Sequence, residues 1–169
     1  MKGIRGFATI ALIILVWLIL PDVLVASTDT RTLVIKAFVG KAAKLTVDTN
    51  TITFPNRDSD EMKQIPSVQG DIKVTVKART GSTSPVNLHI IADGDLVSGT
   101  DAIPVQNVIW QASGQGFLSG TLSKSNVQTA GSWRGSGIRE GVFRYYLKNS
   151  SNYQNGEYQV TITYTLTTP

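Results

Sequence analysis

The residues that could perform acid–base chemistry are few in this chain. It holds a single histidine, His89, and no cysteine. A serine hydrolase uses a histidine as the base that activates its serine. His89 lies between Leu88 and Ile90 in an alternating run, so we expect its side chain on the solvent face of a strand. No motif places a serine or an aspartate beside it, and we therefore expect that this protein is not an enzyme.

One polar loop has side chains at the spacing of calcium ligands. Asn56, Asp58 and Asp60 occupy alternate positions, as at the start of a calcium-binding loop. Such a loop needs glycine at its sixth position and glutamate at its twelfth, and this chain has Glu61 and Ser67 there. The pattern therefore favours a solvated turn over a metal site.

A second acidic cluster follows later in the chain. Asp93, Asp95 and Asp101 lie close together in sequence around Gly94. Glycine supplies a positive φ and aspartates hydrogen-bond locally in turns, which explains the cluster without a metal. Weak calcium binding there is the alternative. We expect no metal and no cofactor in this protein.

Among the aromatic residues, Trp133 has surroundings that suggest a contact surface. The stretch Gly131-Ser132-Trp133-Arg134-Gly135 places a large ring and a cation in a glycine-rich segment. Tryptophan also fills the cores of β-sandwiches, so burial of Trp133 is the default interpretation. The alternative is that Trp133 and Arg134 form a contact surface for carbohydrate or cell wall.

The elements that must position these residues are β-strands. Along Glu157–Leu166, apolar residues including Ile162 alternate with polar ones, which predicts a strand with one buried face. Val142–Leu147 also alternates, and the turn-forming residues between the two segments predict an antiparallel hairpin. Ile72–Ala78 and Val86–Ala92 show the same period of two.

The spacing of these strands predicts the fold class. Short strands separated by turn signals at roughly eight to twelve residues are typical of an antiparallel sandwich or barrel. We expect an all-β fold, a single immunoglobulin-like antiparallel β-sandwich of about seven to nine strands spanning residues 27–169. Without cysteines, such a domain is stabilised by sheet packing and not by disulfides. The net charge of +4 is spread along the chain, so we expect no nucleic-acid partner.

The first residues have the features of an export signal. Met1–Ala26 begins with Lys2 and Arg5, continues through the apolar run Ala8–Leu20, and ends in small residues before Ser27. This pattern predicts a helical signal peptide that is removed, giving a secreted, periplasmic or cell-surface protein. The alternative is an N-terminal membrane anchor, although the run of about 13 residues is short of the roughly 20 that span a bilayer.

The segment Thr32–Val39 raises the question of how this protein associates. Leu33, Ile35, Ala37 and Val39 share one face of a predicted strand, and the residues before them are polar. The strand can pair with its own sheet, which gives a closed monomer. It can also insert beside the final strand of another copy, and such contacts are heterologous and build head-to-tail chains. Both interpretations stay open at the level of sequence.

Three stretches resemble small exported bacterial β-sandwich domains. They are Leu96-x-x-Gly99-Thr100-x-x-Ile103-Pro104, Val108-x-Trp110-x-Ala112-x-Gly114 and Gly156-x-Tyr158-x-Val160-x-Ile162-x-Tyr164. The chain is similar here to spore-coat-U-like and pilin-like subunits, and more distantly to WxL-type surface domains. It departs from both groups: many chaperone–usher subunits carry a disulfide, and neither Trp110 nor Trp133 begins a Trp-x-Leu motif.

These features together lead to one expected function and one alternative. The expectation is a non-catalytic extracytoplasmic structural or adhesion subunit, pilin-like or coat-like, that self-associates by strand pairing or contacts other cell-surface proteins. The alternative is a self-contained cell-surface module that binds carbohydrate or cell wall. Contact with a membrane is expected only through the N-terminal segment, if that segment is not cleaved.

Overall fold

The computed structural model describes residues 29–169, and the predicted signal peptide at 1–26 lies outside the described residues. A compact β unit comprises Phe38–Pro169. Within the described residues there are eleven strands and one short 3-10 helix, and every ladder is antiparallel. The expected all-β fold is confirmed. No helix in this part of the chain has the length and apolar character needed to cross a membrane.

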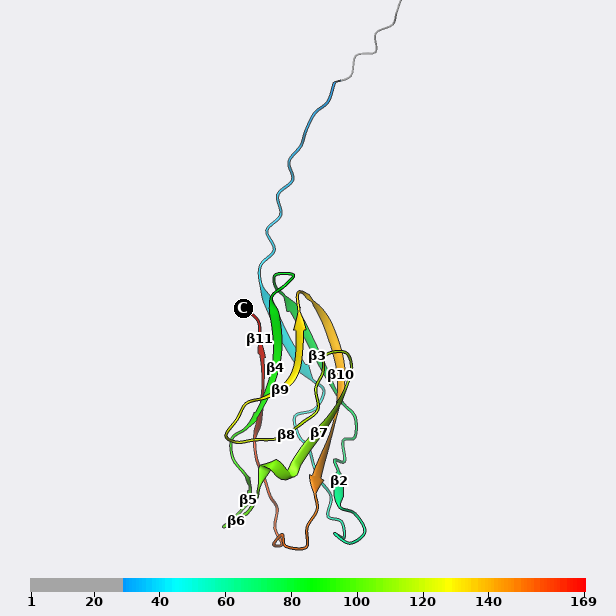
Figure 1. Ribbon diagram of the computed structural model, residues 1–169, viewed down its shortest axis with the longest axis vertical. Coiled ribbons are helices and arrows are strands. Elements are labelled where there is room, and N and C mark those ends of the chain that lie inside the picture. The colour runs from blue at the N-terminus through cyan, green and yellow to red at the C-terminus, as the bar shows by residue number, and fades with distance from the viewer. Residues whose placement is uncertain (1–28) are drawn as a thin grey trace, which may run out of the picture. The chain divides into compact units, whose positions relative to one another are not determined.

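Two sheets account for most of the strands (Figure 1). The first sheet has the order β1 (Ala42–Val47), β3 (Ile72–Arg79), β10 (Gly137–Lys148), β7 (Val108–Ser113) and β8 (Gly120–Thr121), and β2 (Gln64–Pro66) also pairs with β10. The second sheet has the order β11 (Ile162–Thr167), β4 (Pro85–Ala92) and β9 (Gln128–Arg134). A separate hairpin joins β5 (Leu96–Ser98) to β6 (Asp101–Ile103), and the 3-10 turn η1 (Val105–Asn107) leads into β7.

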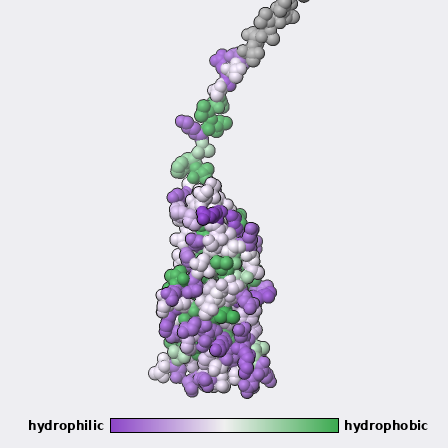
Figure 2. Space-filling model, in the orientation of Figure 1, coloured by the Kyte–Doolittle hydropathy of each residue, from purple (hydrophilic) through white to green (hydrophobic). Residues whose placement is uncertain are grey.

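The core lies between the two sheets and follows the alternation in the sequence. On β3, Ile72, Val74 and Val76 are buried while Lys73 and Lys77 are exposed. The largest fully buried side chains are Trp110, Tyr145 and Phe143. The outer surface is different: the face of the β unit seen in Figure 2 is mostly polar or neutral, with scattered apolar side chains. Burial of apolar area between the sheets is the main source of stability in such a fold.

The strand expected over Thr32–Val39 is not formed. Residues 29–41 have no assigned secondary structure, and Leu33 and Ile35 are 83% and 85% exposed. Alternation indicates which face of a segment is suited to burial, but a strand forms only where a neighbour supplies backbone hydrogen-bond partners. The alternation of this segment is therefore not accompanied by an assigned strand.

The hairpin expected between the last two strands is also absent. β10 pairs with β3 and β7 in the first sheet, whereas β11 pairs with β4 in the second. The connection 149–161 therefore passes from one sheet to the other. Turn-forming residues and a period of two are compatible with either route, because neither identifies the partner of a strand.

Candidate functional site

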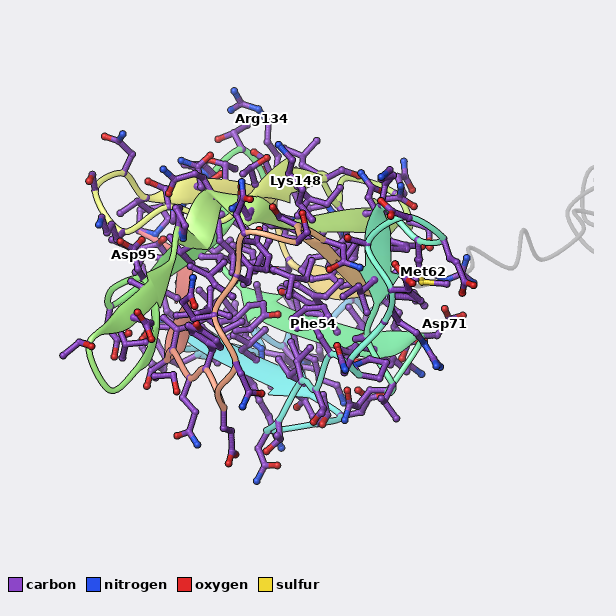
Figure 3. The ribbon with its side chains drawn as sticks, turned by 90° about the horizontal axis from the view of Figure 1, so that it is seen from below. Phe54, Met62, Asp71, Asp95, Arg134 and Lys148 are labelled. Atoms are coloured by element: carbon purple, nitrogen blue, oxygen red, sulfur yellow. The ribbon has the colours of Figure 1, made fainter. Side chains whose placement is uncertain are left out.

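A groove opens in the β unit between the segment that follows β1 and the segment that leads into β11. Its volume is about 1160 Å³. One wall includes Val47, Ile52 and Phe54, and the other includes Val160 and Ile162. Its floor is formed by core residues of the first sheet and of the β5–β6 hairpin, among them Ile72, Leu96, Val108, Tyr145 and Leu147. Figure 3 shows the molecule from below relative to Figure 1, and it labels Phe54. The groove thus exposes apolar side chains that a closed sandwich would cover.

The inner face of the last strand is incompletely covered along its length. Tyr158, Val160, Ile162, Tyr164 and Leu166 alternate with exposed residues as expected, but each of them is only half-buried. On the neighbouring strand β4, Leu88 and Ile90 are 0% exposed. The two strands lie side by side in one sheet, so the difference arises on the far side of β11. Among the described residues, the second sheet has no further strand on that side.

Within residues 29–169, the backbone of β11 is therefore unpaired on that side. β11 is an edge strand of the second sheet. The O atom of Thr161 accepts a hydrogen bond from the N–H of Asp93 at 3.0 Å, and Gln159 exchanges two backbone hydrogen bonds with Val97 at 3.0 and 3.1 Å. Backbone groups of an antiparallel strand alternate in direction, so those of Val160 and Ile162 point to the free edge. An edge of this kind is a template for another strand.

The strand β1 presents a second free edge beside the groove. β1 pairs only with β3 among the described residues, and β1 and β11 lie next to each other. The N–H of Asp48 donates to the O atom of Lys73 at 3.1 Å, which fixes the direction of the alternating backbone groups. Leu45 and Val47 therefore direct their backbone groups away from β3. The groove is bordered by one unpaired edge from each sheet.

A pair of tyrosines joins the two sheets at the groove. The hydroxyl groups of Tyr145 on β10 and Tyr164 on β11 hydrogen-bond to each other, and the ring of Phe143 stacks on Tyr164 with centroids 6.4 Å apart. Burial is the main cause that raises the pKa of Tyr164, to about 12. Burial also raises the pKa of Tyr145 far above its usual value. Both hydroxyls are therefore neutral at physiological pH.

The residues expected to exchange between copies are exposed. Leu33, Ile35, Ala37 and Val39 all have exposed side chains, with Val39 at 67%. On the opposite face of the same segment, Phe38 is 97% exposed. These residues thus combine large apolar side chains with full access to solvent, in a segment whose backbone takes part in no ladder.

Trp133 is buried, as the default interpretation of the sequence has it, and the alternative of a contact surface formed by Trp133 and Arg134 is wrong. Trp133 is 9% exposed, and its Nε1 donates a hydrogen bond to the O atom of Gln115 at 2.7 Å. Its ring packs edge-on against Phe117, with centroids 4.8 Å apart. A Cβ on Gly131 would lie 2.2 Å from the Trp133 ring, so this glycine makes room for the ring. Trp133 belongs to the core, and only Arg134 remains exposed, with its Nη1 donating to the O atom of Thr83.

The polar clusters singled out in the sequence are not brought together. His89 lies on β4, and its cross-strand neighbours are Thr165 on β11 and Thr129 on β9. Asp95 binds Lys124 and accepts a hydrogen bond from the N–H of Val105, and these bonds, led by the one from Lys124, lower the pKa of its carboxyl. Within residues 29–169 no three His, Cys, Asp or Glu side chains converge as metal ligands do.

The groove itself was not predicted from the sequence. Ile52 and Phe54 form part of its wall, in a stretch without assigned strand structure. Val160 lies in the connection that precedes β11. The alternation of these residues indicates burial, but only the missing neighbour of β11 turns buried positions into the wall of a groove.

Neither the known protein-family models nor the curated proteins contain a match to this sequence. The features that bear on function are the groove beside β11 and the exposed apolar residues that precede β1.

Proposed function

We propose that this protein is a non-catalytic extracytoplasmic structural subunit that accepts a β-strand from another copy of itself. The observation that carries the proposal is the free edge of β11 beside an apolar groove. Strand addition suits such a site, because backbone hydrogen bonds give affinity and pockets for alternate side chains give register. The half-buried residues of β11 become core residues once a strand fills the groove.

The strand order supports an immunoglobulin-like sandwich that lacks one strand. In such sandwiches the strands A, B, E and D form one sheet, and C, F and G form the other. By sequence order and pairing, β1-β3-β10-β7 corresponds to A-B-E-D, and β4 and β11 correspond to C and F. The position of strand G, at the outer edge of β11, has no occupant among the described residues. The groove lies along that position.

The segment around Leu33, Ile35, Ala37 and Val39 is the occupant in this proposal. Its alternating apolar side chains fit a groove with apolar walls, and it is exposed and unpaired. Insertion removes these side chains from water, which stabilises a complex by about 1.5–3 kcal/mol for each fully buried leucine or isoleucine.

The connection to β1 favours insertion into a second copy over a tight hairpin with its own β1. Only Gly40 and Lys41 separate the segment from β1, and a two-residue hairpin loop is the commonest connection. Such a loop would place Val39 opposite Ala42, on the outer face of β1, where Ala42 pairs with the exposed Arg79. The apolar face of the segment would then point to solvent. Insertion into another molecule has no such restriction, and repeated insertion builds an open head-to-tail chain.

The proposal is tested with a labelled peptide of residues 29–41 and an acceptor that cannot donate. The acceptor is the chain without residues 1–26 that carries Leu33→Asp and Ile35→Asp, two changes at exposed positions that leave the fold intact. We expect saturable binding of the peptide by fluorescence anisotropy, and no binding of a peptide with the same two changes. If the acceptor does not bind the native peptide and the unaltered chain stays monomeric at high concentration, the proposal is wrong.

A further inference from the structure

Charge is distributed unevenly between the two ends of the β unit. The basic end comprises the start of β1, the β3–β4 turn and the β9–β10 turn, at the top of Figure 1. It carries Lys44, Lys77, Arg79, Arg134 and Arg139. The acidic end comprises the loops 48–63, 93–104 and 149–161, at the bottom of Figure 1.

The cations of the basic end lack counterions. Lys44 lies directly opposite Lys77 on the exposed face of the first sheet, and the other neighbour of Lys77 is Ile138. Like charges in directly opposed positions destabilise a sheet. Among residues 29–169, neither Lys44, Lys77 nor Arg79 takes part in an ion pair. The basic end therefore keeps an arrangement that costs stability in the isolated subunit.

Two other cations of the same sheet are paired. Lys73 on β3 binds Glu140 on β10 at 3.2 Å. Arg144 on β10 binds Asp71, and the hydrogen bond from Arg144 is the main cause that lowers the pKa of the Asp71 carboxyl. Lys73 and Arg144 of this sheet are therefore paired, whereas Lys44, Lys77 and Arg79 at the basic end are not.

The acidic end holds carboxylates that also lack a partner. Asp60 and Asp95 bind Lys63 and Lys124. Six others take part in no ion pair within the described residues, namely Asp48, Asp58, Glu61, Asp93, Asp101 and Glu157. The strand β10 runs from the basic end to the acidic end, about 36 Å at about 3.3 Å per residue. This distance exceeds the Debye length of about 8 Å at physiological ionic strength, so the charges of one end are screened from those of the other, and each end has its own electrostatic potential.

The groove opens at one of these ends, and residues 29–41, the donor segment, join the β unit at the other. The groove is lined by residues 49–57 and 149–161, so it opens at the acidic end. The donor segment leads directly into Ala42, the first residue of β1, which lies at the basic end. A donor that inserts into the groove of a second copy therefore brings its basic end to the acidic end of that copy.

We infer that subunits stack end to end, with the basic end of one copy against the acidic end of the next, and that this charge complementarity sets the direction and the rate of association. The inference rests on the proposed strand addition and names a second contact between the same two copies. Complementary charges across an interface accelerate encounter and suppress wrong orientations more than they raise affinity. The unpaired cations of the basic end then meet carboxylates in the assembled chain.

The test compares two substitutions that change the net charge equally at opposite ends. Lys77→Glu removes a cation from the basic end, and it also replaces the repulsion from Lys44 by attraction, so loss of folding does not explain a slower assembly. Lys63→Glu is the matched control, because Lys63 is exposed and lies at the acidic end. Assembly of the chain without residues 1–26 is followed by light scattering at low and high salt.

We expect Lys77→Glu to slow assembly about tenfold at low salt and the difference to vanish near 1 M salt, where the Debye length is about 3 Å. Lys63→Glu is expected to leave the rate unchanged or to raise it. Equal rates for all three proteins, or equal slowing by both substitutions, overturn the inference. Binding of the peptide of residues 29–41 to the acceptor distinguishes failure of this inference from failure of the proposed function. If the assembly rates contradict the inference but the peptide still binds, strand addition stands and only the end-to-end charge contact is rejected. A chain that stays monomeric at every salt concentration contradicts the inference as well.

Discussion

Tyr145 and Tyr164 hydrogen-bond to each other through their hydroxyl groups across the two sheets, on the wall of the groove. Tyr145 is 1% exposed, and Tyr164 belongs to the half-buried face of β11. Buried polar groups are stable only when they find a partner, so each tyrosine depends on the other. The pair holds the free edge strand β11 to the first sheet at the place where no further strand covers it.

Removal of one hydroxyl should therefore destabilise more than removal of both. Tyr164→Phe leaves the Tyr145 hydroxyl buried without a partner, which we expect to lower the free energy of unfolding by about 1–3 kcal/mol. The double variant Tyr145→Phe/Tyr164→Phe is expected to lose less than this. Urea denaturation of the three proteins measures the difference. A double variant that loses the sum of both single losses would show that the two hydroxyls do not interact.

The same pair should set the alkaline limit of stability. Burial raises the pKa of Tyr164 to about 12 from its usual value of 10.0. The folded state then keeps its proton where the unfolded state loses it, so the contribution to stability is complete below about pH 10 and is lost as pH rises toward 12. We expect the free energy of unfolding to fall between these values. The double phenylalanine variant should show a flatter profile in the same range, and an identical decline in both proteins would rule out this origin.

The sequence predicted the faces of the strands well and their neighbours poorly. The alternation on β3 and β4 identified the buried residues Val74 and Ile90 correctly. The same rule predicted a buried Ile162, which is only half-buried because β11 has a free edge. Alternation is a local property of one segment, whereas burial also depends on which segments lie beside it. For the same reason the prediction that the last two strands form a hairpin was wrong.

The candidate site was likewise only partly predictable from the sequence. The apolar face of Leu33 and Ile35 is evident from the sequence, but the exposure of both side chains is visible only in the structure. The glycines around Trp133 suggest, in the sequence, a contact surface as the alternative to burial. Gly116 and Gly131 instead make room for its ring, since a Cβ on either would lie 2.2 Å from a Trp133 atom. A sequence does not distinguish a glycine that allows the close approach of another group from a glycine that allows a turn.

Two isoleucines on adjacent strands should distinguish the core from the wall of the groove. Ile90 is 0% exposed, and Ile90→Ala is expected to cost about 2–5 kcal/mol of unfolding free energy. Ile162 is half-buried, so Ile162→Ala should cost roughly half as much in the chain that carries Leu33→Asp and Ile35→Asp. It should also weaken binding of the peptide of residues 29–41. Equal losses of stability, with peptide binding unchanged, would mean that Ile162 is an ordinary core residue.

Strand addition at β11 has a signature in amide hydrogen exchange, resolved residue by residue by NMR. In the acceptor chain, the N–H groups of Val160, Ile162 and Tyr164 point to the free edge, whereas Gln159 donates to the O atom of Val97 at 3.1 Å. We predict fast exchange at the three even-numbered residues and slow exchange at Gln159 in the free protein. Saturation with the peptide of residues 29–41 should protect the even-numbered amides and leave Gln159 unchanged. If the peptide binds and the amides of Val160, Ile162 and Tyr164 still exchange as fast as before, no strand has been added to β11 and the central claim is contradicted.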